Sequence, residues 1–126
     1  MIQSGNVRVR FAPSPTGELH LGSARTALFN YLFTKHNKGK FLLRIEDTDY
    51  ERSQRAHVEQ AISSVKWLGF VPDEEIVFQS SRSNIYKKYL DYLLTNGAAY
   101  RCFASKEELK RNRLETNSFQ YNGIWR

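Results

Sequence analysis

Two segments of the chain have the pattern of apolar residues that is typical of β-strands. In Val7–Phe11 apolar and basic residues alternate, which predicts a short strand with one polar face. Lys40–Ile45 contains a run of apolar residues without helical periodicity, which predicts a buried strand. A later apolar segment, Ala99–Phe103, is a further candidate strand.

Apolar residues spaced three or four positions apart predict three helices. The first is expected to run from about His20 to His36 and to stop near Gly39, and the other two to close at Gly69 and Gly97. The apolar positions that define these helices are Ala24, Ala27, Leu28, Tyr31 and Leu32, then Val58, Ala61, Ile62, Val65 and Leu68, and finally Tyr86, Tyr89, Leu90 and Leu93.

A fourth helix, up to about Leu114, is predicted from Ser105 and Glu108, which have the spacing of a capping box. The order of elements is then β-α-β-α-α-β-α, which is typical of an α/β fold with a parallel sheet and right-handed crossovers. Such doubly wound sheets hold ligands at the carboxyl ends of their strands, where the loops 12–17 and 46–49 are expected. Because only two core strands are clear, we expect the doubly wound fold to be incomplete in this chain.

The 126 residues suit one domain or part of a larger one. No apolar run reaches about 18 residues, and Met1–Asn6 lacks the apolar block of a secretory signal, so we expect a cytoplasmic protein without a membrane span. The net charge of +6 suits a polyanionic partner such as a nucleic acid. The single cysteine, Cys102, excludes an internal disulfide and is expected to be buried within its strand.

The loop after the first strand and the start of the first helix read A-P-S-P-T-G-E-L-H-L-G-S, from Ala12 to Ser23. Backbone N–H groups at a helix N-terminus bind anions. Near that first turn, His20 can donate to a phosphate, and Gly22 lets a nucleotide approach the backbone. A rigid loop whose histidine only caps the helix is the alternative for His20 taken alone. The spacing is neither the dinucleotide-binding fingerprint nor a P-loop.

The acidic cluster Glu46–Asp49 follows the second strand. Alternation places Arg44 and Glu46 on one face at the strand's end, where a carboxylate can hold an ammonium group. Arg10, at the end of the neighbouring strand, can hold a carboxylate through a bidentate pair. Together they predict a site for an amino acid, and the alternative is a solvated acidic turn with weak ion pairs. A calcium loop is excluded, because its sixth position lacks glycine and its twelfth lacks an acid.

These segments resemble the glutamyl-tRNA synthetase family of class I aminoacyl-tRNA synthetases. R-F-A-P-S-P-T-G-E-L-H-L-G-S, which begins at Arg10, is similar to that family's version of the class I H-I-G-H signature. A-L-F-N-Y-L, R-I-E-D-T-D, W-L-G-F and Y-R-C-F follow in the family's order, so the resemblance covers essentially the whole chain. The first segment together with R-I-E-D-T-D is highly specific.

The resemblance implies ligation of L-glutamate to its tRNA through a glutamyl-adenylate, with ATP and Mg²⁺ as substrate. The implied partners are glutamate tRNA, through its acceptor end, L-glutamate and ATP, and the implied state is a monomer. Carried over by motif, the glutamate-binding residues are Arg10, Ala12, Ser14 and Glu46, the ATP-binding residues are Thr16, Gly17, His20 and Gly22, and the catalytic signature residues are His20 and Gly22.

The chain also departs from the family's pattern. The first signature ends in Ser23 where other class I enzymes have histidine. Some members bind zinc through a C-x-C pair and a later cysteine. In this chain Cys102 remains as the first cysteine of the pair, but Ala104 and Trp125 occupy the positions of the other two. We therefore predict no zinc and no other metal site.

The second signature of the family, a K-M-S-K-S-type loop, does not occur in the sequence. We therefore expect an N-terminal fragment of the enzyme that cannot charge tRNA by itself. Residues 1–96 are expected to form the N-terminal half of the catalytic, Rossmann-like nucleotide-binding fold. Residues 97–126 are expected to begin an inserted acceptor-stem-binding region, which is truncated.

Three other functions are alternatives to this one. Glutaminyl-tRNA synthetases have a first motif closer to P-P-E-P-N-G, and the A-P-S-P-T-G of this chain argues against them. A glutamyl-queuosine-type tRNA-modifying synthetase tends to have E-D-I-D where this chain has E-D-T-D. A non-catalytic module that binds tRNA or an adenine nucleotide is the alternative if the protein is naturally this short.

Overall fold

The computed structural model describes residues 7–116. The chain divides into two compact units, Met1–Asn84 and Ile85–Arg126, which are described separately. Two features of the sequence lie outside the described residues: Trp125, at the place of a zinc ligand in some relatives, and Met1–Asn6, which lacks a signal-like apolar block.

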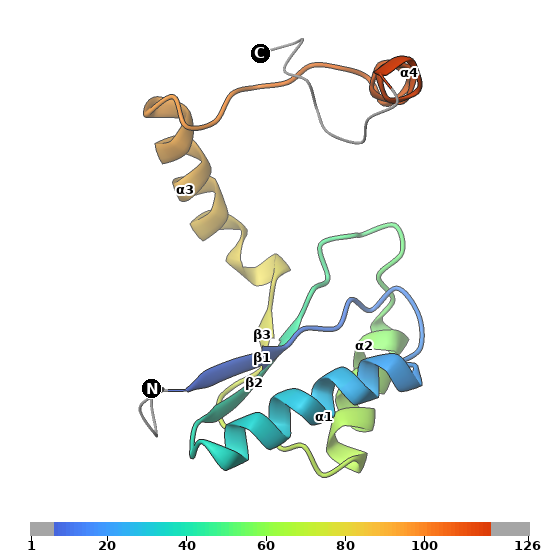
Figure 1. Ribbon diagram of the computed structural model, residues 1–126, viewed down its shortest axis with the longest axis vertical. Helices are drawn as coiled ribbons and strands as arrows, with labels where there is room; N and C mark the ends of the chain where they lie inside the picture. Colours follow the sequence, from blue (N-terminus) through green and yellow to red (C-terminus); the bar gives the residue numbers. More distant parts are fainter. Residues whose placement is uncertain (1–6, 117–126) are drawn as a thin grey trace. The chain divides into compact units, whose positions relative to one another are not determined.

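A three-stranded parallel sheet in the order β1-β2-β3 forms the centre of the first unit (Figure 1). The strands are β1 (Arg8–Phe11), β2 (Lys40–Ile45) and β3 (Val77–Phe78). The predicted α/β class with a parallel sheet is confirmed. The sequence pattern does not predict β3, because two residues show no periodicity.

Two helices connect the strands, α1 (Leu21–His36) and α2 (Arg55–Trp67), and both lie on the same face of the sheet (Figure 1). The predicted first helix is confirmed within one residue at its start. The second helix closes at Gly69 as predicted, where the N–H of Gly69 donates to Lys66 O and that of Phe70 to Val65 O.

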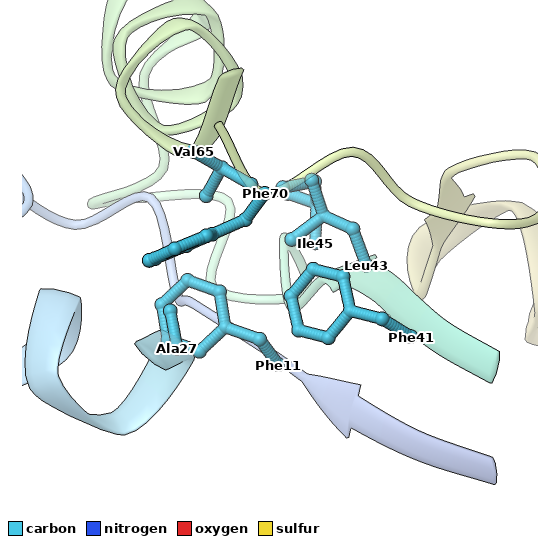
Figure 2. Close-up of a cluster of buried hydrophobic side chains, with 7 residues drawn as sticks. All are labelled: Phe11, Ala27, Phe41, Leu43, Ile45, Val65 and Phe70. Atoms are coloured by element: carbon cyan, nitrogen blue, oxygen red, sulfur yellow. The ribbon is translucent and has the colours of Figure 1, made fainter. Parts of the chain in front are cut away.

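The hydrophobic core lies between these helices and the sheet (Figure 2). Alternate residues of β2 point into it, and Tyr31 of α1 packs against two of the phenylalanine rings at centroid distances of 5.5 and 4.8 Å. Burying each large apolar side chain contributes about 1.5–3 kcal/mol. The buried members of the cluster are Phe11, Ala27, Phe41, Leu43, Ile45, Val65 and Phe70.

The other face of the sheet carries charged side chains, because residues of β1 and β2 alternate between the two faces. In the parallel register Arg10 lies beside Leu42, and both belong to this second face. At the start of the strands, Glu74 pairs with Arg8 at 2.8 Å and with Lys40 at 3.1 Å. We call this the charged face of the sheet.

The turn between α1 and β2 explains why glycine occupies position 39. The N–H of Gly39 donates to Thr34 O, and the next N–H, that of Lys40, donates to Val7 O. A Cβ on Gly39 would lie 2.3 Å from Val7 O and 2.8 Å from Val7 Cβ. Lys38, and not Gly39, has the positive φ of this turn, 51°. Glycine is therefore required at position 39 for the close approach of the two chain segments, and not for an unusual backbone conformation of its own.

Gly39→Ala is therefore expected to destabilise the first unit by about 1–3 kcal/mol, because the methyl group overlaps the backbone of the neighbouring segment. The measurement is the melting temperature of the full-length gene product. Gly17→Ala is the matched control, since a Cβ there meets no atom within 4 Å. Equal melting temperatures for Gly39→Ala and the wild type would contradict the prediction.

The second unit contains most of α3 (Ser83–Thr95), which follows a 3-10 turn at Ser80–Arg82, and all of α4 (Lys106–Thr116). The predicted closure of α3 is confirmed, because the N–H of Gly97 donates to Leu94 O. The capping box is also confirmed. Ser105 N donates to Glu108 Oε2 at 2.7 Å, and Glu108 N donates to Ser105 Oγ at 3.2 Å.

The prediction of a strand at Ala99–Phe103 is wrong. This segment has no regular secondary structure, because no strand among residues 7–116 pairs with it. Cys102 is consequently exposed, where the sequence predicted a buried side chain.

Candidate active site

Charged side chains from adjacent strands meet at the carboxyl edge of the sheet. Arg10 Nη2, near the end of β1, lies 3.8 Å from Oε1 of Glu46, the residue that follows β2. Arg44 Nε lies 4.0 Å from the same oxygen. These distances exceed hydrogen-bond length, so the groups attract each other across a gap. The predicted proximity of a guanidinium and a carboxylate at this edge is thus present in the structure.

The proline-containing loop lies next to these charges. The N–H of Glu46 donates to Pro13 O at 3.0 Å, and the N–H of Gln54 donates to Pro15 O at 3.2 Å. Pro15 is fully buried. The loop is therefore held by backbone hydrogen bonds from the segment that follows β2.

Helix α2 supports the same loop from another side. Gln60 Oε1 accepts a hydrogen bond from the N–H of Leu19 at 3.0 Å. This bond fixes the residue immediately before His20. Sequence reasoning misses Gln60, because its partner is 41 residues away and no local pattern marks the pair.

A cavity of about 230 Å³ lies between the loop and helix α2. Four predicted ATP- or glutamate-binding residues, Ser14, Thr16, Gly17 and His20, contribute to its lining. Within the described first unit, Arg10, Ala12, Gly22 and Glu46 are not part of that lining. The complete lining consists of Pro13, Ser14, Thr16, Gly17, Glu18, Leu19, His20, Ser23 and Ala61. Pro13, which lines the cavity, accepts a hydrogen bond from the N–H of Glu46, so the cavity adjoins the charged pair Arg10–Glu46.

His20 is the N-cap of α1. Its Nδ1 accepts a hydrogen bond from the N–H of Ser23 at 3.3 Å, and its Nε2 lies 3.3 Å from Ser23 Oγ. A Cβ at Gly22 would lie 3.0 Å from Nδ1 and Cε1 of the imidazole, so the glycine leaves room for the ring to fold over the first turn. Within the described helix α1, the first turn carries no acidic side chain, and its positive dipole end favours an anion.

The carboxylates of the acidic cluster Glu46–Asp49 have different partners. Asp47 accepts hydrogen bonds from Ser80 N at 2.9 Å and from Ser80 Oγ at 2.6 Å. Partial burial acts to raise the pKa of Asp47, but hydrogen bonds to its carboxylate, foremost those from Ser80, together outweigh burial and hold this pKa below its usual value. Asp49 accepts from Arg52 Nε at 2.7 Å, and mainly through this bond its pKa is also lowered. Glu46 is therefore the acid of this cluster that faces Arg10.

This arrangement suits an amino-acid ligand beside an anion. A guanidinium and a carboxylate can bind the opposite charges of a zwitterion, with charge-assisted hydrogen bonds replacing the long pair. The adjoining helix N-terminus can bind phosphate. Among residues 7–116, no three His, Cys, Asp or Glu side chains gather as metal ligands would. No helix in the described part of the chain is long and apolar enough to cross a membrane.

The sequence profile of the family described as tRNA synthetases class I (E and Q), catalytic domain, matches residues 6–125. The chain belongs to this family. The resemblance inferred from the motifs is thus confirmed, and so is the Rossmann-like fold of a class I synthetase catalytic domain.

The class I synthetase chain is 58% identical over 127 residues to glutamate–tRNA ligase 2 of Rickettsia bellii strain OSU 85-389. The match covers 98% of this chain and 27% of that relative. Glutamate–tRNA ligase 2 of Rickettsia akari strain Hartford is 58% identical over 125 residues, or 96% of this chain and 27% of the relative. The chain therefore spans about a quarter of the length of these relatives.

Solved structures give the same family. A glutamate tRNA ligase from Elizabethkingia meningosepticum, determined in complex with its amino acid, superposes with a TM-score of 0.78 at 47% identity. The glutamate-tRNA synthetase of Elizabethkingia anophelis gives 0.79 at 47% identity. Each match covers 89% of this chain and 24% of the other.

Proposed function

We propose that this chain is the part of a glutamate–tRNA ligase that binds L-glutamate and ATP. The observation that carries the proposal is the approach of Arg10 to Glu46 at the carboxyl edge of the sheet, 3.8 Å apart. It supports a zwitterion site beside the cavity at the start of α1. The relatives named glutamate–tRNA ligase support the choice of amino acid.

Glutamate offers three charged groups, and the proposed site has complementary charges for two of them. Glu46 binds the ammonium group. Arg10 binds a carboxylate, and the side-chain carboxylate is the better choice, because the α-carboxylate must remain available to react. Ala12 and Ser14 line the glutamate pocket in this proposal.

ATP occupies the neighbouring site and brings magnesium with it as Mg·ATP. The N-terminal end of α1 and the imidazole of His20 attract the phosphates. Gly17 and Gly22 leave room for the nucleotide to approach the backbone, and Thr16 lines the cavity beside Gly17. In this proposal His20 exchanges its capping contact with Ser23 for a phosphate oxygen.

The reaction has two steps. An oxygen of the α-carboxylate attacks the α-phosphorus of ATP, and the bond to pyrophosphate breaks, which leaves glutamyl-adenylate. A ribose hydroxyl of the terminal adenosine of the tRNA then attacks the acyl carbon, and AMP leaves. Both steps depend on positioning and on stabilising the developing phosphate charge, without a covalent bond to the enzyme.

We also propose how the chain is divided into functional regions. Residues 1–96 form the N-terminal half of the catalytic fold, and residues 97–126 begin an insertion that binds the acceptor end of the tRNA. The net charge of +6 is compatible with such a partner. We expect the enzyme to act in the cytoplasm as a monomer, as the family implies.

The decisive experiment measures transfer of labelled glutamate by the full-length gene product to glutamate tRNA and to aspartate tRNA. Charging of the terminal adenosine of glutamate tRNA is the expected result. Preferential labelling of aspartate tRNA would instead support the glutamyl-queuosine-type enzyme. Binding of tRNA or ATP without any transfer would support the non-catalytic module.

A further inference from the structure

Asp47 is the acid of the 46–49 cluster that is bound to a distant segment of the chain. Both of its carboxylate oxygens accept hydrogen bonds from Ser80, at 2.9 Å from the backbone nitrogen and 2.6 Å from the hydroxyl. Ser80 lies 33 residues further along the chain, in the turn after β3. The contact thus connects the segments that leave the carboxyl ends of β2 and β3.

The residue before Asp47 is Glu46, whose backbone is hydrogen-bonded on the other side, toward β1. Its N–H donates to Pro13 O at 3.0 Å, in the loop that follows β1. On the other side, the N–H of Gln79 donates to Ile45 O at 2.9 Å. The short segment 45–47 is therefore held by hydrogen bonds to the segments that follow both neighbouring strands, and the Asp47–Ser80 contact belongs to the side of β3.

We propose that Asp47 is a positioning residue, which holds the backbone of Glu46 so that the Glu46 carboxylate meets the ammonium group of the amino-acid substrate. This inference rests on the proposed function, because it concerns the same glutamate site. Asp47 itself faces Ser80 and does not touch the substrate.

The strength of the contact supports this role. Hydrogen bonds to an ionised carboxylate are shorter and about twice as strong as neutral ones. The lowered pKa of Asp47 means that the carboxylate stays ionised at neutral pH. Because Glu46 binds the ammonium group of glutamate in this proposal, a modest loosening of its backbone weakens glutamate binding and raises KM for glutamate.

The experiment compares Asp47→Ala, which removes both contacts, with Ser80→Ala, which removes only the hydroxyl donor. The full-length gene product is assayed for glutamate charging, and KM is determined separately for glutamate and for ATP. We expect Asp47→Ala to raise KM for glutamate about tenfold, and Ser80→Ala to raise it less, with KM for ATP unchanged. Ser80→Thr keeps the hydroxyl and is expected to restore the wild-type KM.

Glu59→Gln is the matched control. It also removes one negative charge from the first unit, but Glu59 forms an exposed pair with Arg55 on α2. The control is expected to have the wild-type KM for both substrates. If Asp47→Ala fails to fold, Ser80→Ala and Ser80→Thr still test the contact, because the carboxylate and the backbone donor remain in place.

A uniform loss of kcat with an unchanged KM for glutamate would overturn the inference, because it would indicate a merely structural role. Wild-type kinetics in both Asp47→Ala and Ser80→Ala would overturn it as well. In both cases the wild-type enzyme charges glutamate, so the proposed function stands. A wild-type enzyme that does not charge glutamate would overturn the proposed function and this inference together.

Discussion

Arg10→Gln is expected to lower kcat/KM for glutamate about 30-fold to 150-fold, which corresponds to about 2–3 kcal/mol. Losing one partner of a buried, hydrogen-bonded charge pair costs about 2–5 kcal/mol. The lower part of that range applies here, because the Arg10 side chain is 49% exposed and water weakens its interactions. Preference for glutamate over glutamine should fall at the same time, since the guanidinium distinguishes a carboxylate from an amide.

Arg8→Gln is the control for this experiment. Arg8 lies on the same strand and the same charged face as Arg10, but it pairs with Glu74 away from the carboxyl edge. An exposed ion pair contributes about 0–1 kcal/mol, so this variant should keep nearly wild-type charging. Similar losses in the two variants would mean that the net positive charge matters and that Arg10 has no specific contact with glutamate.

The second large effect is expected at His20, where capping and phosphate binding can be separated. His20→Ala removes both, so kcat should fall about 100-fold to 1,000-fold, as when a single donor to a developing anion is lost. The melting temperature should also fall, because losing an N-cap costs about 0.5–2 kcal/mol.

His20→Asn separates the two roles, because asparagine is a good N-cap but has no imidazole. It should restore the melting temperature without restoring kcat. His36→Asn, at the exposed opposite end of α1, is the control and should leave both unchanged. Full activity in His20→Asn would show that the histidine only caps the helix, which is the simpler interpretation of the hydrogen bond to Ser23.

The first unit of the fold could be predicted in detail because its signals are local. Alternation in Val7–Phe11 and the apolar run in Lys40–Ile45 indicate strands, and the glycine at 69 indicates a helix end. The two errors in the strand predictions have a cause that is not local. A strand requires a partner, and Ala99–Phe103 has none among the described residues, while Val77–Phe78 is a strand only because the edge of β2 pairs with it.

The same distinction applies to the candidate site. The meeting of Arg10 and Glu46 follows from alternation and from the parallel direction of two strands, so the sequence predicts it. The roles of Asp47 and Gln60 depend on partners 33 and 41 residues away. Hydrogen bonds between such distant residues leave no periodic pattern in the sequence, and they became visible only in the folded chain.

The alternation of β1 and β2 has a consequence for how such a protein changes over evolutionary time. Phe11, Leu43 and Ile45 fill the core, whereas Arg10 and Glu46 occupy the opposite side of the same backbone. A point mutation on the charged side alters what the site recognises without opening a cavity in the core. Substrate preference and foldability are thereby inherited almost independently, although the residues that encode them alternate within the same two short stretches of the gene.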